Sequence, residues 1–162
     1  MQESSNKIIQ HGEIVSFDTD MVGPYGYCAD ISRTFVCGNV FNHNQKELYS
    51  MSLEQINHNS SLIKADMSFR EFTEKSWKLP NEYYGNRYSV MVHGIGLCDE
   101  WPSIRYPTDG GDNSGRFQKN MTVTVESYIG KVGGKEGVKL EQQYLVGENG
   151  LELMSHHPLE DI

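Results

Sequence analysis

Cysteine, proline and positive charge are all scarce in this 162-residue sequence. Its three cysteines, Cys28, Cys37 and Cys98, are odd in number and form no Cys-x-x-Cys motif, which argues against a disulfide scaffold and against a thiolate zinc site. The 14 basic residues face 22 acidic ones, and the resulting net charge of −8 offers no electrostatic footprint for nucleic acid or anionic lipid. No apolar run approaches the roughly 20 residues that span a bilayer.

The chain length and its first residues narrow the class further. The length suits a single domain of ordinary globular composition. The opening MQESSNKIIQ is polar and lacks the apolar stretch of a signal peptide. We therefore expect a cytoplasmic protein with neither a nucleic-acid nor a membrane partner.

Patterns of apolar residues predict a mixture of strands and helices. The predicted strands cover residues 14–20, 30–37, 88–93, 121–126 and 138–146, and the predicted helices cover 44–65 and 68–78. Ser68 followed by Glu71 is the signature of a capping box. Because strands outnumber helices and are joined by loops, we expect the α+β class with a largely antiparallel sheet. The first strand begins with no element before it to cover its face, so we expect the chain to be the C-terminal part of a larger unit.

Acidic residues and one histidine stand at positions where their neighbours are apolar or form turns: Asp18, Asp20, Asp30, His93, Glu126 and Glu141. Asp18 and Asp20 are two apart on a predicted strand, so both should leave the same face. Carboxylates gathered inside a sheet would repel each other and lose hydration unless cations neutralise them. Several carboxylates with one imidazole suit two transition-metal ions about 3.5–4 Å apart. The alternative is a solvated strand face on which each acid meets its own lysine or arginine.

Five motifs in order carry a resemblance to a known superfamily. They occupy residues 17–20, 26–35, 93–96, 122–126 and 137–141. Together they resemble the metal-binding motifs of the methionine aminopeptidase, prolidase and creatinase superfamily, over nearly the whole chain from about Lys7. The resemblance implies a pita-bread fold that is incomplete at its N-terminal side, with residues 1–162 forming the C-terminal portion of the catalytic domain. It also implies that the dinuclear metal ligands fall on the six residues above, with Asp18 or Asp20 as alternatives.

Two departures separate this sequence from the peptidases of that superfamily. Those peptidases carry a second histidine in a pattern like His-Gly-x-Gly-x-x-x-His-Glu, whereas His93 is followed by Gly-Ile-Gly-Leu-Cys-Asp-Glu-Trp. Their usual Glu-Pro-Gly is replaced by Glu126, Ser127 and Tyr128. Peptide hydrolysis is therefore less expected than metal binding.

The departures are similar to those of the lyase branch that cleaves dimethylsulfoniopropionate to dimethyl sulfide and acrylate. That branch uses three aspartates, one histidine and two glutamates as its metal ligands, and they match the same six residues. Its proposed base lies six residues after the histidine, which is Asp99 here. Its substrate-binding tyrosine lies five residues before the histidine, which is Tyr88 here. On residue pattern alone, Asp99 could instead be a turn aspartate and Tyr88 a core residue.

The lyase resemblance implies two divalent transition-metal ions, iron first, with manganese, zinc or cobalt as alternatives. It implies a small-molecule substrate and a homodimer in the full-length form. The elimination itself removes a proton alpha to a carboxylate while a sulfonium leaves as a neutral sulfide, and two metal ions would stabilise the negative charge that develops. Two rival interpretations remain: a metallopeptidase of the Xaa-Pro type, and a binding module that keeps the fold without catalysis.

Overall fold

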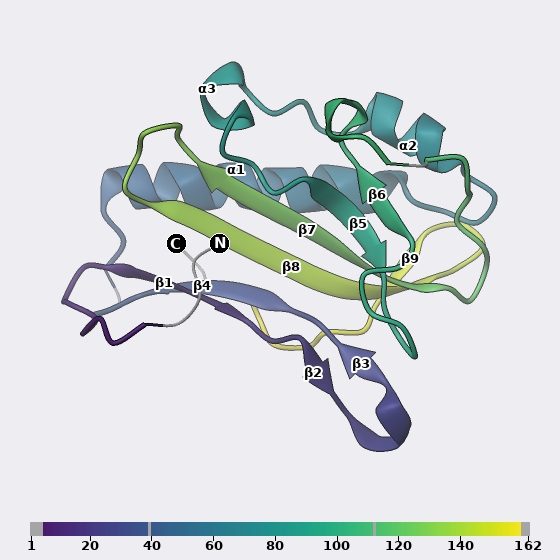
Figure 1. The fold of residues 1–162 in the computed structure, drawn as a ribbon, viewed down its shortest axis with the longest axis horizontal. Helices are drawn as coiled ribbons and strands as arrows, with labels where there is room; N and C mark the ends of the chain where they lie inside the picture. The colour runs from purple at the N-terminus through teal and green to yellow at the C-terminus, as the bar shows by residue number, and fades with distance from the viewer. Residues whose placement is uncertain (1–4, 39, 112, 160–162) are drawn as a thin grey trace.

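A five-stranded antiparallel sheet forms the centre of the protein (Figure 1). The structure is a computed structural model that describes residues 5–38, 40–111 and 113–159. The strand order in the sheet is β6-β5-β7-β8-β9. These strands are β5 (Val90–Gly94), β6 (Ser103–Arg105), β7 (Thr122–Gly130), β8 (Gly137–Val146) and β9 (Leu151–Leu153).

Two small antiparallel hairpins precede the sheet in the chain. The first pairs β1 (Ile14–Asp18) with β4 (Ser32–Val36), and the second pairs β2 (Met21–Val22) with β3 (Cys28–Ala29) around the 3₁₀ turn η1 (Pro24–Gly26). Thr34 fixes β4 to β8, because its hydroxyl donates to the carbonyl of Lys139 and accepts from the amide of the same residue. The hairpin of β1 and β4 therefore lies alongside β8 (Figure 1).

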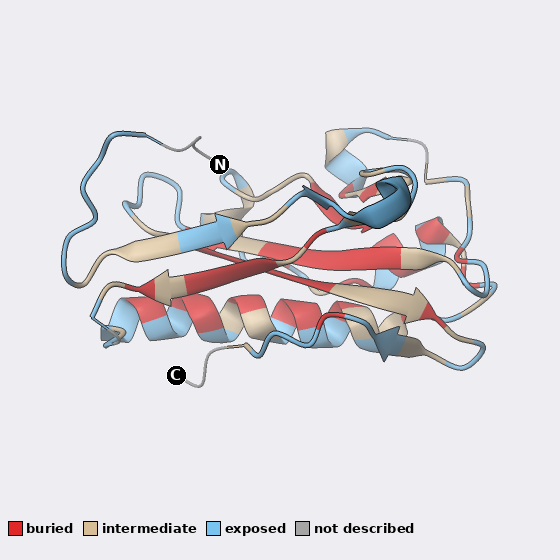
Figure 2. Cartoon of the chain, turned by 90° about the horizontal axis from the view of Figure 1, so that it is seen from below, coloured by how far each residue is buried: buried red, intermediate tan, exposed pale blue. Residues whose placement is uncertain are grey.

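The long helix α1 (His43–Leu62) covers one face of the sheet (Figure 1). Asn42 caps it, since its side chain accepts from the amide of Gln45 while the Gln45 side chain accepts from the amide of Asn42. Figure 2 shows the buried side of α1 turned toward the strands. The remaining helical segments are α2 (Phe69–Lys75), α3 (Asn81–Tyr84) and the 3₁₀ turn η2 (Pro107–Asp109).

Side chains alternate along the strands, so the residues of the core lie on one face of the sheet and the acidic residues on the other. Val125 is buried in the core, and Ser127 on the same side of β7 bonds to Ser52 and Gln55 of α1. Since side chains alternate along a strand, Glu126 between them points to the other face. Glu141, its register partner on β8, points there as well. One face of the sheet is thus apolar and packed on α1, while the other carries acids.

The predicted α+β class and antiparallel sheet are confirmed, and so are the long helix and the Ser68 N-cap of α2. The two predicted helices are shorter than expected, ending at Leu62 and Lys75. The prediction that the strand includes Asp20 was wrong, because β1 ends at Asp18 and Asp20 has a φ of 21°. The carboxylates of Asp18 and Asp20 nevertheless lie close together, as expected. The strand predicted from Tyr88 begins only at Val90.

Within the part of the chain that the structure describes, none of the helices combines the length and the apolar character that a membrane crossing requires.

Candidate metal centre

Three strands of the sheet bring His93, Glu126 and Glu141 to the face that α1 does not cover. Glu126 and Glu141 are register partners across β7 and β8. His93 lies on β5 opposite Thr124, and two positions separate Thr124 from Glu126 on β7. All three side chains are almost fully buried, with 2% or less of each residue exposed. Their convergence follows from register alone, because residues of equal parity on paired strands share one face.

The hairpin strands add the aspartates from the other side. Asp18 ends β1, and Asp30 stands two residues before β4 begins. Two sets of side chains each bring ligand atoms within 4.8 Å of one another: Asp30 with His93 and Glu141, and Asp18 with Asp20 and Asp30. Asp30 belongs to both sets, so it links the hairpin to the sheet. The structure therefore gathers all six residues singled out from the sequence.

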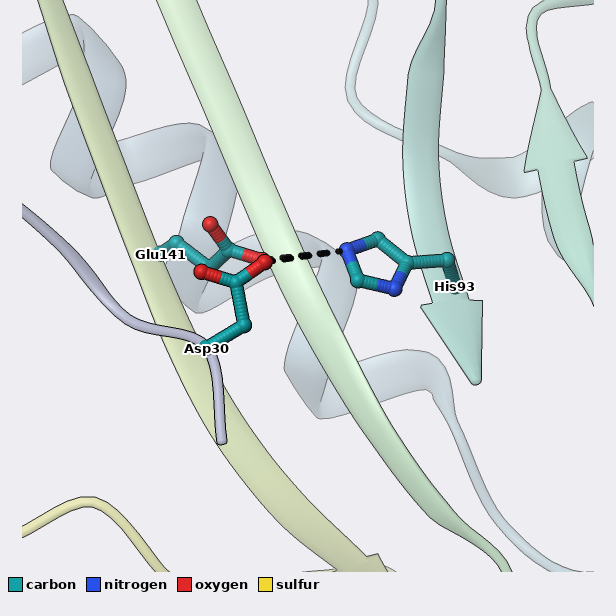
Figure 3. A group of neighbouring side chains, drawn as sticks. All are labelled: Asp30, His93 and Glu141. Atoms are coloured by element: carbon teal, nitrogen blue, oxygen red, sulfur yellow. Dashed lines mark hydrogen bonds and ion pairs between the residues drawn. The ribbon is translucent and has the colours of Figure 1, made fainter. Parts of the chain in front are cut away.

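His93 points its Nε2 atom into this cluster (Figure 3). Nε2 lies 3.2 Å from Glu141 Oε1 and 3.7 Å from both Asp30 Oδ2 and Glu126 Oε1. On the other side of the ring, Nδ1 lies 3.0 Å from the carbonyl oxygen of Gly94, to which it can donate. A histidine whose Nδ1 donates to a carbonyl keeps the Nε2 lone pair free for a metal ion.

A lysine that sequence reasoning did not single out completes the cluster. Lys139 Nζ lies 2.8 Å from Glu126 Oε2, 3.1 Å from Asp18 Oδ2 and 3.4 Å from Glu141 Oε2. The signal was present in the sequence, because Lys139 stands two residues before Glu141 on a strand and must therefore share its face. Ser32 joins the same group, with its hydroxyl 2.9 Å from Glu141 Oε2 and also bonded to Asp18.

Burial and mutual repulsion perturb two of the carboxyl groups strongly. Burial, the charge of Glu141 and the charges of Asp18 and Asp20 raise the pKa of Asp30 to about 8. Burial and the charge of Glu141 likewise raise the pKa of Glu126 to about 8, although Lys139 and His93 oppose the change. Both carboxyls therefore hold a proton at neutral pH when no other cation compensates them.

His93 and Glu141 form a charged pair within the same site. Burial alone would lower the pKa of His93, but its hydrogen bond with Glu141 and the charges of Glu126 and Glu141 raise that pKa to about 10. Burial alone would raise the pKa of Glu141, but the hydrogen bond with His93 and the charge of Lys139 lower it to about 2. The carboxylates around His93 therefore favour a positive charge at this position, and the proton on its imidazole supplies that charge.

The site fits divalent metal ions by its own chemistry. Two of its buried oxygens, Asp30 Oδ1 and Glu126 Oε1, lack a hydrogen-bond partner among the described residues. Buried polar atoms are nearly always satisfied, so two carboxylate oxygens without a hydrogen bond beside an imidazole fit the coordination of a cation. Several carboxylates with one imidazole suit manganese, iron, cobalt or zinc.

Asp99 and Tyr88 lie at the edge of this cluster. Asp99 Oδ1 is 3.9 Å from His93 Nδ1, and 29% of the Asp99 side chain is exposed. Asp99 is also close enough to Asp20 to raise its pKa, after burial and the charge of Asp18. The Tyr88 ring centre is 4.9 Å from Lys139 Nζ, and its hydroxyl donates to Glu100 across 3.2 Å. Both residues border the cluster, and their roles stay predictions.

An α+β fold that gathers five carboxylates and one imidazole is typical of a metal-dependent enzyme. Comparison with known proteins identifies the family. Residues 1–148 match the model of the metallopeptidase family M24. The chain belongs to this family.

Two curated relatives are especially similar to the chain. It is 37% identical to the dimethylsulfoniopropionate lyase DddP of Roseovarius nubinhibens over 163 residues, and 35% identical to the DddP of Roseobacter denitrificans over 167 residues. Each alignment covers 98% of this chain and 36% of the relative. The chain thus spans just over a third of the length of these lyases.

Among solved structures, the prolidase of Pyrococcus furiosus superposes with a TM-score of 0.77 at 25% identity, covering 95% of this chain and 45% of that one. The likeness confirms the pita-bread fold expected from the sequence motifs.

Proposed function

We propose that this chain carries the metal centre of a carbon–sulfur lyase that cleaves dimethylsulfoniopropionate to dimethyl sulfide and acrylate. The six ligands in this proposal are Asp18, Asp20, Asp30, His93, Glu126 and Glu141. The observation that carries it is the place of Asp99, whose carboxylate lies 3.9 Å from His93 Nδ1 at the partly exposed edge of the carboxylate cluster. The similarity to two DddP lyases supports the same substrate.

In the proposed reaction, Asp99 is the base. Its carboxylate takes the proton from the carbon alpha to the substrate carboxylate, and the electron pair of that C–H bond forms the C=C bond of acrylate. The C–S bond breaks at the same time, and its electrons leave with sulfur as neutral dimethyl sulfide. Bound divalent ions would supply positive charge against the negative charge that develops on the substrate carboxylate.

Residues around the base suit a cationic substrate. The side chains of Leu97 and Trp101 flank Asp99 in the sequence, and both residues are 71% exposed. Tyr88 lies beside the same loop, since its hydroxyl donates to Glu100, the residue after Asp99, and its ring borders the cluster at Lys139. An aromatic ring beside carboxylates attracts a sulfonium through both its apolar face and its quadrupole. We assign substrate binding to Tyr88 on this basis.

A metallopeptidase of the Xaa-Pro type is the alternative, and the prolidase-like fold favours it. Against it stands the loop after His93, which offers no second histidine before His156. The test incubates the purified protein, loaded with iron or manganese, with dimethylsulfoniopropionate and with an Xaa-Pro dipeptide. Dimethyl sulfide in the headspace with equimolar acrylate supports the lyase, whereas proline release without dimethyl sulfide refutes it. If the protein retains no transition metal after loading and dialysis, the non-catalytic binding module is favoured.

The proposal extends to the metal and to the setting of the enzyme. Iron as the preferred ion and a homodimer rest on the resemblance to the lyase branch, and a cytoplasmic location rests on the three unpaired cysteines. Metal analysis of protein purified without added metal and measurement of its mass in solution test the first two, and fractionation of the native cells tests the third.

A further inference from the structure

Lys139 places an ammonium group inside the carboxylate cluster. Its nitrogen contacts three acids, Glu126 at 2.8 Å, Asp18 at 3.1 Å and Glu141 at 3.4 Å. An ammonium group has three N–H donors, so each can be directed at a different carboxylate. The lysine side chain is only 3% exposed. Solvent therefore does little to screen its charge from the acids around it.

The position of this ammonium group is fixed from several sides. The backbone amide and carbonyl of Lys139 both bond to the Thr34 hydroxyl, at 3.0 and 2.7 Å. The Tyr88 ring covers the charged end, with its centre 4.9 Å from Nζ. Lysine usually bears its charge on a flexible stem, but here strand, hairpin and ring together hold it. The ammonium group is thus a permanent part of the site.

Lys139 contacts only one of the two carboxylate oxygens of each glutamate. Glu126 and Glu141 turn their Oε2 atoms to Lys139 and their Oε1 atoms to Nε2 of His93. Each glutamate therefore keeps one oxygen for an ion on the His93 side while the other is held by the lysine. Asp18 contacts the lysine through Oδ2, while its other oxygen, Oδ1, accepts from the Ser32 hydroxyl.

We propose that Lys139 is a positioning residue of the metal centre. Its ammonium charge holds the ligand carboxylates together in the metal-free protein, and as a like charge it weakens the binding of divalent ions there. Without the ammonium group, Asp18, Glu126 and Glu141 would each lose a buried ionic partner, and the contact between the hairpin and β8 would weaken. With the ammonium group present, an incoming ion is repelled at short range in a poorly screened environment. The residue stabilises the metal-free site at a cost in metal affinity.

The test compares Lys139→Met with wild type, and uses Lys46→Met on the exposed side of α1 as the matched control. Calorimetric titration with Mn²⁺ should show binding about tenfold or more tighter in Lys139→Met. The thermal midpoint of that variant in EDTA should fall, and the rise caused by saturating Mn²⁺ should exceed that of wild type. The control should match wild type in all three measurements. Weaker or unchanged Mn²⁺ affinity in Lys139→Met would overturn the proposal.

The variant Lys139→Arg tests whether the charge or the shape of the lysine side chain sets the Mn²⁺ affinity. It retains a cation, so its Mn²⁺ affinity should stay within about threefold of wild type. Tightening equal to that of Lys139→Met would mean that charge is not the cause, and the proposal fails. If Lys139→Met stays insoluble with and without Mn²⁺, Lys139→Gln provides the same neutral comparison. None of these readouts needs a substrate, so a protein without lyase activity would refute the proposed function and leave this inference standing.

Discussion

Gly94 faces the carbonyl oxygen of Trp101 so closely that a Cβ atom at position 94 would stand 2.1 Å from it. The amide of Gly94 also donates to the carbonyl of Pro102 across 2.9 Å, and the amide of Cys28 donates to Gly96. The loop that carries Asp99 is therefore held against the end of β5 on one side and against β3 on the other. Its geometry depends on the missing side chain at Gly94.

We accordingly expect Gly94→Ala to displace this loop. Loss of the close backbone approach should lower the turnover of the proposed lyase reaction by about 100-fold, the order of effect of a small misplacement of a catalytic group. Metal content should change little, because the six proposed ligands lie outside the displaced loop. Gly150→Ala is the control, since a Cβ atom there meets nothing within 4 Å. A fully active Gly94→Ala would show that the loop tolerates the side chain.

Asp99→Asn tests the base directly. The amide retains the shape of the carboxylate but cannot accept the substrate proton, so turnover should fall by roughly 10²–10⁴-fold. Mn²⁺ stoichiometry, measured by elemental analysis after dialysis, should equal that of wild type. Glu74→Gln on the exposed side of α2 is a matched loss of one carboxylate. Wild-type turnover in Asp99→Asn would assign the base to another residue.

Asp30 belongs to both groups of converging ligand atoms, so its loss should affect every ion. We expect Asp30→Asn to reduce Mn²⁺ affinity by at least about 100-fold, beyond the 10–100-fold cost of disturbing an outer partner of a metal ligand. Equilibrium dialysis with elemental analysis measures this. Glu152→Gln, an exposed carboxylate on β9, should bind as wild type does. Retained affinity in Asp30→Asn would remove this residue from the ligand set.

The perturbed carboxyls predict that metal affinity increases with pH. Asp30 and Glu126, each with a pKa of about 8, and His93, with a pKa of about 10, are protonated in the metal-free protein at pH 6. Metal binding must displace these protons, so affinity should rise about tenfold per pH unit for each proton released. Titration calorimetry in buffers of different ionisation heat counts the protons. An affinity that does not vary between pH 6 and 8 contradicts the assignment.

The stability of the metal-free protein should change in the opposite sense. Asp30, Glu126 and His93 all have folded-state pKa values above their unfolded ones, so the folded state binds more protons. Their stabilisation is present at low pH and is lost as pH rises through about 8 for the carboxyls and about 10 for His93. Glu141, with a pKa of about 2, stabilises the protein above pH 4.5 and adds no change from pH 6 to 9. Thermal midpoints in EDTA should therefore fall from pH 6 to pH 9.

Substitution of Arg33 should change only the stability of the fold. Its buried guanidinium donates to the carbonyl of Glu141 at 2.6 Å, to the Gln142 side chain at 2.6 Å and to the carbonyl of Pro158 at 3.0 Å. Arg33→Met should leave these buried acceptors unpaired and destabilise the protein by about 3 kcal/mol or more. Urea unfolding measures this, with Arg70→Met on the exposed side of α2 as control. An equal midpoint in both variants would show that water replaces the guanidinium.

Periodicity predicted the elements with strong local patterns. The long helix and the strands at residues 138–146 and 121–126 were found because their apolar residues alternate or recur on one side. The short strands β2, β3, β6 and β9 were missed, since two or three residues carry no period and pairing partners distant in the sequence decide their state. The position of Asp20 outside the strand was missed for a related reason, because the positive φ of a single residue departs from strand geometry.

Some residues of the site could likewise be predicted from the sequence, and others could not. The acids were found from family motifs and from their unusual neighbours, whereas Lys139 was overlooked because a lysine on a strand is ordinarily solvated. Its true surroundings depend on the hairpin of β1 and β4, more than 100 positions earlier in the chain. Strand alternation could place Lys139 on the face of Glu141, but its contact with Asp18 could not be read from local pattern.

The separation of the ligands along the chain has a consequence for folding. Asp18 and Glu141 meet only after the first hairpin has docked on β8, a closure that spans most of the polypeptide. Pairings this distant form slowly, since a large loop must close before any contact rewards it. The complete set of six proposed ligands therefore exists only after this docking, although the sheet by itself already brings His93, Glu126 and Glu141 together. Full metal uptake should report the moment at which a newly made chain completes its topology.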